Sequence, residues 1–253
     1  MLLETMGVTM RFGGLTAVND VTLGIEKGSI CGLIGPNGAG KTTLFNILSG
    51  VYKPTGGKIL FEGEDITGLL PFKVNIKGIS RTYQTIHLFG NMTVLENVLI
   101  GMHPRMKTGF WQACFRTQKQ RDEEKESIAR AEDLLDFVNL REKKDQISSS
   151  LSYGEQRLLE IVRAMASSPK IILLDEPAAG MNSREKMDLN DTIKKIRDRS
   201  MTVLLVDHDM GLVMKATDYI FVLSFGKKIA EGSPSEVKNN PDVIAAYLGD
   251  DDL

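Results

Sequence analysis

The chain has 253 residues, of which 42% are hydrophobic and 25% are charged, so it can bury one large globular core. Its formal net charge of -2 argues against nucleic acid as a partner, because nucleic acid binding usually requires a basic surface that displaces counterions. No apolar stretch approaches the roughly 20 residues that span a bilayer, and no secretory signal pattern begins the sequence, so we expect neither a membrane span nor export.

Two kinds of β-strand are predicted. Residues 18–25 and 58–61 tend to alternate apolar and polar side chains, which indicates half-buried antiparallel strands near the N-terminus. The later strands are short and almost continuously apolar, as parallel strands buried on both faces are. They cover residues 29–34, 170–174, 202–206 and 219–223. Cys31 lies in the first of these, so we expect a buried thiol in a reducing, cytoplasmic setting.

Helical segments separate the parallel strands. Residues 41–48, 157–167 and 184–199 carry apolar side chains at helical spacing, so strand and helix alternate as in a doubly wound α/β sheet. Such a sheet supplies a ligand site at its strand ends. Residues 88–150 break the alternation, because they are charged, favour helix and contain few strand signals. We interpret this stretch as a helical lobe inserted into the core.

A glycine-rich loop follows the strand at residues 29–34. It matches the pattern G-x-x-x-x-G-K-[ST], with a strand before it and a helix after it, a context that disfavours a chance glycine-rich turn. Backbone amides of such a loop turn toward a phosphate, and the helix start adds its dipole. Lys41 can reach the terminal phosphates, and the Thr42 hydroxyl can ligate magnesium. The predicted phosphate-binding residues are Gly35, Pro36, Asn37, Gly38, Ala39, Gly40, Lys41, Thr42 and Thr43.

Two adjacent carboxylates follow the apolar strand at residues 170–174. Asp175 is suited to hold magnesium through its water shell, and Glu176 to polarise an attacking water. Phosphoryl transfer is catalysed mainly by positioning and charge neutralisation, so these two jobs would complete a hydrolytic site. Alone, an Asp-Glu pair after a strand is usually a solvated loop, but the phosphate loop makes the functional interpretation the stronger one.

The segment Leu-Ser-Tyr-Gly-Glu-Gln at residues 151–156 resembles the signature sequence of ATP-binding cassette (ABC) proteins, whose usual form is Leu-Ser-Gly-Gly-Gln. Tyr153 and Glu155 depart from that form. On local grounds alone Ser152 and Glu155 form a capping box, which is the simpler explanation. The resemblance to the ABC family implies more: Ser152 and Gly154 would clamp the terminal phosphate of ATP bound by a second copy of the chain.

The ABC resemblance covers essentially the whole chain and implies an α/β P-loop (RecA-like) nucleotide-binding fold with an antiparallel β layer and an inserted α-helical lobe. It implies one ABC ATPase domain over residues 1–253. Residues 1–87 and 157–253 would form its nucleotide-binding core, and residues 88–156 the helical lobe with the signature. The cofactors implied are ATP and Mg²⁺.

Single residues also match the ABC pattern. Gln84 would bridge magnesium and the attacking water to the helical lobe, and His208 would contact the terminal phosphate as a switch. A lone histidine is more often a structural hydrogen-bonding residue, but its place after the strand at residues 202–206 favours the switch role. Phe12 resembles the aromatic that stacks on adenine, with Val18 as a packing neighbour, although a strand phenylalanine is usually core. Asn182 stands where many relatives carry aspartate.

Four stretches resemble the ATP-binding subunits of branched-chain and other hydrophobic amino-acid importers: residues 10–14, 88–98, 176–182 and 240–249. This resemblance implies an ATP-hydrolysing motor, peripheral to the cytoplasmic face of the cell membrane. Its partners would be transmembrane permease subunits, a second ATPase as homodimer or heterodimer, and indirectly an external binding protein. The resemblance also implies that the transported substrate is set by those partners and not by this chain.

Three alternatives stay open. The motor of a lipopolysaccharide exporter shares the catalytic motifs and differs in its membrane partner. A soluble ABC protein of translation or DNA repair is disfavoured, because such proteins usually carry two cassettes or long coiled coils. A nucleotide kinase or GTPase acting alone leaves the signature and His208 unexplained.

Two segments are candidates for contact with a membrane partner. Residues 85–89, just after Gln84, are the better candidate for docking a cytoplasmic helix of a permease. Phe110, Trp111 and Phe115 are interspersed with basic residues and could touch headgroups, although ordinary packing within the lobe is the favoured explanation.

Overall fold

The computed structural model describes residues 1–105 and 118–248, and its internal contacts divide the chain into two compact units. The core unit comprises Met1–Arg81 and Lys170–Leu253, and the helical unit comprises Thr82–Pro169. The helical unit includes the helix that follows the signature, a segment that the sequence analysis placed in the nucleotide-binding core. Within the described residues, no helix is long and apolar enough to cross a membrane.

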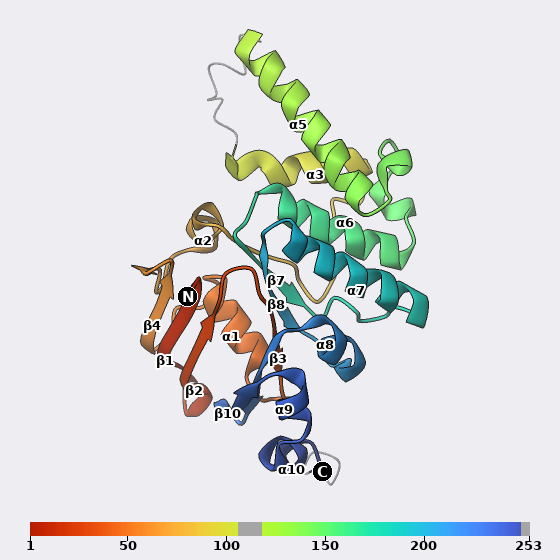
Figure 1. The fold of residues 1–253 in the computed structure, drawn as a ribbon. Coiled ribbons are helices and arrows are strands. Elements are labelled where there is room, and N and C mark those ends of the chain that lie inside the picture. The colour runs from red at the N-terminus through yellow and green to blue at the C-terminus, as the bar shows by residue number, and fades with distance from the viewer. Residues whose placement is uncertain (106–117, 249–253) are drawn as a thin grey trace. The chain divides into compact units, whose positions relative to one another are not determined.

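An antiparallel sheet forms the first layer of the core unit (Figure 1), with strand order β2-β1-β4-β5. Val21, Leu23 and Ile25 of β2 are buried while the residues between them are more exposed, which is the alternation expected for a half-buried sheet. The predicted antiparallel layer is therefore confirmed. Its strands are β1 (Leu3–Phe12), β2 (Leu15–Ile25), β4 (Gly56–Phe61) and β5 (Glu64–Asp65).

A six-stranded sheet forms the second layer, in the order β10-β9-β3-β8-β7-β6. All its pairs are parallel except β10 with β9, and every residue of β3, β7 and β8 is buried, as the continuous apolar runs predicted. Parallel pairing brings the C-terminal ends of β3, β7 and β8 to one sheet edge. The strands are β3 (Ile30–Ile34), β6 (Ile79–Arg81), β7 (Ile171–Asp175), β8 (Thr202–Val206), β9 (Tyr219–Ser224) and β10 (Lys227–Gly232).

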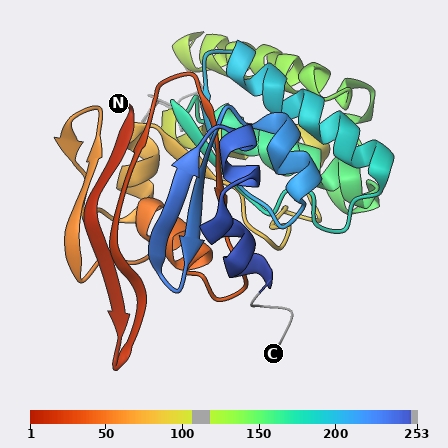
Figure 2. The same cartoon turned by 60° about the horizontal axis from the view of Figure 1, so that its bottom comes forward.

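Helix α1 lies between the two sheets (Figure 2). Its apolar residues Leu44, Phe45 and Leu48 join one buried cluster with Leu3 of β1 and Leu33 of β3, so both sheets and α1 share a single core. This packing fixes the phosphate loop that precedes α1. The helices of the core unit are α1 (Lys41–Leu48), α2 (Pro71–Lys77), α7 (Ser183–Asp198), α8 (Met210–Ala216), α9 (Pro234–Lys238) and α10 (Pro241–Leu248).

In its described residues the helical unit contains the α-helices α3 (Val94–Met102), α5 (Gln118–Phe137) and α6 (Tyr153–Ala166), with short 3₁₀ turns at His103–Arg105, Arg141–Lys143 and Ser148–Ser150. Helix α3 packs against both α5 and α6. A Cβ atom on Gly101 of α3 would lie 2.2 Å from the carbonyl oxygen of Arg163 in α6, so only glycine allows this close approach. The helical character predicted for residues 88–150 is confirmed for the described part of that stretch.

Candidate nucleotide site

The phosphate loop between β3 and α1 requires glycine at two positions. Gly35 has φ +152° and a Cβ there would lie 2.1 Å from the Leu223 carbonyl oxygen; Gly40 has φ +99° and its Cβ would lie 2.4 Å from the Ala17 carbonyl oxygen. Neither space nor backbone conformation admits another residue. At Gly35 and Gly40 the glycine spacing therefore reflects close backbone approach.

Lys41 turns back over this loop. Its Nζ donates hydrogen bonds to the carbonyl oxygens of Gly35 at 2.6 Å and Pro36 at 2.8 Å, and the residue is only 6% exposed. In the described structure no side chain caps the start of α1, and its first turn holds no acidic residue. Buried positive charge and helix amides without a side-chain cap together suit an anion such as phosphate.

Asp175 ends β7 as a buried carboxylate with 4% of its side chain exposed. Its Oδ2 accepts a hydrogen bond from Arg81 Nη2 at 2.7 Å. The sequence analysis singled out Asp175 but not Arg81. A buried carboxylate normally requires such a cationic partner.

Glu176 and His208 form a pair at the same sheet edge. Glu176 Oε1 lies 2.8 Å from His208 Nε2, and the Glu176 amide donates to the Val206 carbonyl at 2.7 Å. Glu176 has φ +46°, a conformation that costs a non-glycine residue roughly 1–3 kcal/mol and is typical of functional sites. The direct contact between these two side chains was not predicted, because they are far apart in sequence.

Asp207 is a second residue that the sequence analysis missed. Its carboxylate accepts hydrogen bonds from the amides of Ala178 at 3.0 Å and Asp209 at 2.8 Å. Burial raises the pKa of Asp207, the two amide donors oppose that rise, and the charges of Asp209 and Glu176 add to it. Asp207 thus joins the loop after Glu176 to the loop that carries His208. Its position directly after a buried strand was the available signal.

Phe12, the predicted adenine-stacking residue, is 43% exposed at the end of β1. Its ring meets that of Tyr52 edge to face, with centroids 5.4 Å apart and planes at 75°. Val18 is fully buried in the core cluster. Tyr52, the contact partner of the Phe12 ring, was not singled out from sequence.

Gln84, Ser152 and Gly154 belong to the helical unit. The Gln84 carbonyl accepts a hydrogen bond from Arg157 Nη2 at 2.7 Å, while its side chain is in an exposed segment. Ser152 caps α6: its Oγ accepts from the Glu155 amide at 3.4 Å, and Glu155 Oε2 accepts from the Ser152 amide at 3.1 Å. The predicted capping box is therefore present. Gly154 is buried in the first turn of α6.

The predicted site residues therefore fall into two groups. The core unit holds Phe12, the phosphate loop, Asp175, Glu176 and His208. Asp175 ends β7, Glu176 follows it, and His208 lies shortly after β8, whose C-terminal end shares one sheet edge with that of β7. The helical unit holds Gln84, Ser152 and Gly154. In the described residues no group of three or more His, Cys, Asp or Glu side chains forms a metal cluster of its own.

Comparison with known proteins identifies the family. The sequence model of the ABC transporter family matches residues 18–179, and the model named branched-chain amino acid ATP-binding cassette transporter matches residues 227–252. The chain belongs to the ABC transporter ATP-binding family. Members of this family hydrolyse ATP to power transport, so the expected ATPase activity and the resemblance to the amino-acid importer subfamily are confirmed.

Several relatives match this ABC ATPase over nearly its whole length. The high-affinity branched-chain amino acid transport ATP-binding protein BraF of Pseudomonas aeruginosa is 48% identical over 250 residues, covering 98% of each chain. The high-affinity branched-chain amino acid transport ATP-binding protein LivG of Escherichia coli is 46% identical over 250 residues, covering 98% of each chain. A probable LivG of Archaeoglobus fulgidus is 39% identical, covering 99% of this chain and 96% of its own.

Solved structures confirm the ABC ATPase fold. The ADP conformation of an ATP-binding cassette of an ABC transporter matches with TM-score 0.85 and 32% identity over 98% of each chain. A dimeric cassette in a post-hydrolysis state, bound to ADP and phosphate, matches with TM-score 0.76 and 25% identity, covering 92% of this chain and 98% of its own. ABC cassettes of this fold therefore bind adenine nucleotide, and at least one does so as a dimer.

The candidate docking segment at residues 85–89 is held in place at its end. The Phe89 amide donates to Asn97 Oδ1 at 3.0 Å, and the Phe89 carbonyl accepts from Asn97 Nδ2 at 3.2 Å and from Ser148 Oγ at 2.9 Å. The Phe89 ring itself is 49% exposed. Phe110, Trp111 and Phe115 lie outside the described residues. Both docking candidates stay predictions.

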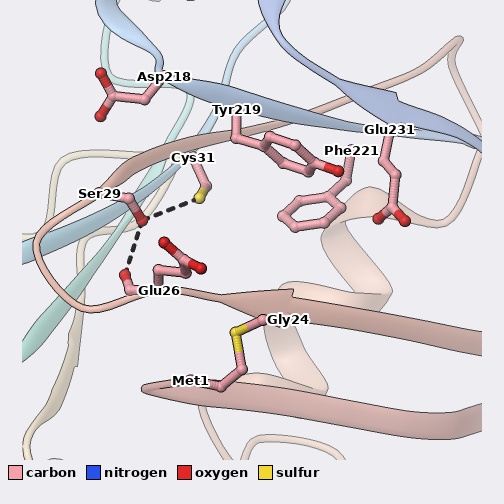
Figure 3. A pocket seen from close by; sticks show the side chains of 9 residues that line it. All are labelled: Met1, Gly24, Glu26, Ser29, Cys31, Asp218, Tyr219, Phe221 and Glu231. Atoms are coloured by element: carbon pink, nitrogen blue, oxygen red, sulfur yellow. Dashed lines mark hydrogen bonds between the residues drawn. The ribbon is translucent and has the colours of Figure 1, made fainter.

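A pocket of about 480 Å³ lies elsewhere in the core unit (Figure 3), near the N-terminal end of β3. It contains none of the predicted site residues, and its lining includes the carboxylates Glu26, Asp218 and Glu231. Burial raises the pKa of Cys31 there to about 11; a hydrogen bond between Cys31 and Ser29 opposes the rise, and the charge of Asp218 adds to it. A negative field of this kind repels phosphates, so this pocket is not the nucleotide site. The expected burial of Cys31 is confirmed.

Proposed function

We propose that this ABC ATPase is the motor subunit of an importer of branched-chain amino acids. The names of the full-length relatives and the second family model over residues 227–252 support the substrate class. The observation that carries the ATP-driven motor is the 2.8 Å contact between Glu176 and His208 at the sheet edge where the phosphate loop begins. Such a pair supplies a base and its orienting partner for hydrolysis.

The phosphate loop would cradle the nucleotide. Residues 35–43 offer backbone amides to the phosphates, and the Lys41 ammonium would exchange its two carbonyl partners for the terminal phosphate oxygens. Phe12, with its ring held by Tyr52 and partly exposed, would stack against adenine. These roles rest on the match between the loop geometry and the chemistry of a polyphosphate.

Mg²⁺ suits the oxygen donors present. Thr42 is exposed in the first turn of α1, and Asp175 ends the neighbouring β7. Magnesium keeps most of its water and is usually bound by one or two protein oxygens together with substrate phosphates, so a full protein cage is not required. We assign Thr42 and Asp175 to the metal, with Gln84 as a further ligand from the helical unit. When bound, Mg²⁺ neutralises charge on the terminal phosphates.

Glu176 would polarise the attacking water, and His208 would hold Glu176 while facing the terminal phosphate. With 15% of the Glu176 side chain and 49% of the His208 side chain exposed, His208 is the more open of the two and can reach a ligand. The left-handed backbone of Glu176 keeps its carboxylate in a position that an ordinary extended residue would not reach. Positioning of this kind is the main source of catalysis in phosphoryl transfer.

Two copies would complete the site. Ser152 and Gly154 at the start of α6 would clamp the terminal phosphate held by the opposite chain, so ATP would close the dimer and hydrolysis would reopen it. The second copy is either identical or a sibling ATPase. Transmembrane permeases would dock at residues 85–89 on the cytoplasmic face of the membrane, and an external binding protein would deliver the amino acid.

The variant Glu176→Gln tests the motor. We expect it to accumulate as an ATP-bound dimer in size-exclusion chromatography while ATP turnover is almost abolished, because binding is retained and water activation is lost. The exposed Glu142→Gln is the matched control and should behave as the wild-type chain. Only monomer with ATP would count against the proposal. Purification of the tagged chain from host membranes should recover hydrophobic permeases; ribosomal or repair partners alone would contradict the importer.

A further inference from the structure

Arg81 occupies a buried position between three polar side chains of the core unit. Its Nη2 donates to Asp175 Oδ2 at 2.7 Å, and its Nη1 donates to Asn46 Oδ1 at 2.7 Å and to Ser49 Oγ at 2.9 Å. Only 5% of the Arg81 side chain is exposed. The guanidinium also lies 5.6 Å from the centre of the Phe45 ring. Every one of these partners is on another element.

The partners connect two elements of the proposed metal site. Asp175 ends β7, whereas Asn46, Ser49 and Phe45 belong to or directly follow α1, the helix that begins at Lys41. Asn46 lies four residues after Thr42, so both are on the same face of α1. Arg81 therefore sets the place of the Asp175 carboxylate relative to the helix that carries Thr42.

The chemistry of this contact requires arginine. A planar guanidinium can serve a carboxylate and two neutral acceptors at once, while an ammonium is a point charge on a flexible stem. A buried carboxylate that loses its cation is left without compensation and moves from its place. Ser49 is already oriented, because its hydroxyl donates to the Phe45 carbonyl at 2.8 Å and leaves its oxygen to accept from Arg81.

We propose that Arg81 is a positioning residue of the nucleotide site, which holds the Asp175 carboxylate at a fixed place relative to Thr42 so that both can serve one Mg²⁺. This inference rests on the proposed function, which assigns the metal to Asp175 and Thr42. Arg81 itself touches neither nucleotide nor metal. Its effect is on the affinity for the metal and not on nucleotide binding as such.

The test measures ATP turnover against Mg²⁺ concentration for Arg81→Met and Arg81→Lys. Loss of a partner that orients a metal ligand typically weakens metal affinity roughly 10- to 100-fold, so the half-saturating Mg²⁺ concentration should rise by that factor. Binding of a fluorescent ATP analogue in EDTA should stay unchanged, which a merely unfolded or distorted chain would not show. Arg141→Met is the matched control, since Arg141 forms an exposed ion pair with Glu132.

Asn46→Ala keeps the inference falsifiable if the Arg81 variants fold poorly. It removes one of the contacts between Arg81 and α1 and leaves the contacts with Ser49 and Asp175, so the half-saturating Mg²⁺ concentration should rise in the same direction by a smaller factor. An unchanged or lower Mg²⁺ requirement in a folded Arg81→Lys or Asn46→Ala chain overturns the positioning role.

Asp175→Asn separates this inference from the proposed function. If Asp175→Asn raises the half-saturating Mg²⁺ concentration while the Arg81 and Asn46 variants leave it unchanged, the metal assignment stands and the role of Arg81 fails. If Asp175→Asn keeps the wild-type Mg²⁺ dependence, the metal assignment fails and the inference about Arg81 falls with it. In that case, the double variant Arg81→Met with Asp175→Asn can still be compared with the two single variants in urea unfolding. A midpoint shift that differs from the sum of the two single shifts would then show only that Arg81 and Asp175 form a structural ion pair.

Discussion

Replacing Arg157 with methionine should destabilise the chain strongly. Arg157 lies on α6 and is fully buried, and its guanidinium donates to Glu160 Oε2 at 2.8 Å and to the carbonyls of Tyr83 and Gln84 at 2.7 Å each. Glu160 is only 1% exposed, so the variant leaves a buried carboxylate without its cation. Breaking one partner of such a pair costs about 3–5 kcal/mol. That is a large share of the roughly 5–15 kcal/mol by which domains are stable.

The assay is urea unfolding followed by circular dichroism, with Arg141→Met as the exposed counterpart and Arg157→Met with Glu160→Met as the charge-free double variant. The double variant should recover most of the free energy of unfolding that Arg157→Met loses, because the uncompensated charge is gone. The part that is not recovered reflects the hydrogen bonds that the carbonyls of Tyr83 and Gln84 have lost. A loss no larger than that of Arg141→Met would refute the reasoning. So would a double variant as unstable as the single one.

Two further predictions concern the core unit. Gly35→Ala should abolish nucleotide binding and lower the free energy of unfolding by about 1–3 kcal/mol, because its Cβ would lie 2.1 Å from the Leu223 carbonyl oxygen. Gly14 has open space around it, so the control variant Gly14→Ala should bind nucleotide as the wild-type chain does. Equal nucleotide binding by both variants would contradict the steric argument. A hydrogen bond from Lys186 lowers the pKa of Asp209, so this contact stabilises the fold above the ordinary carboxyl pKa and is lost as the pH falls through the lowered pKa. In urea unfolding, the Lys186→Met variant should therefore be less stable than the wild-type chain at pH 7 and equally stable at strongly acidic pH. A stability difference that does not change with pH would argue against a stabilising contact between Lys186 and ionised Asp209.

The sequence predicted the elements whose signals are local. Continuous apolar runs located β3, β7, β8 and β9 within one or two residues, because a strand buried on both faces needs no information from elsewhere in the chain. The start of α6 was placed four residues late, at Arg157, although Ser152 and Glu155 already spelled the capping box that begins it at Tyr153. The edge strand β10 was missed, since its half-buried residues show neither alternation nor a continuous apolar run.

The contacts that give the site its geometry join residues that are far apart in the sequence. Arg81 lies 94 residues from Asp175 and 35 from Asn46 in the sequence, and Glu176 lies 32 from His208. Composition and spacing say which residues have the chemistry for a nucleotide site, but only the fold decides which of them meet. The motif therefore predicted Asp175 and Thr42 as oxygen donors, while the residue that sets the relation between them stood unrecognised three positions before Gln84. In this chain the predicted catalytic groups are readable from local pattern, and the contacts that join Arg81 to Asp175 and Asn46 become visible only when β6, β7 and α1 are brought together.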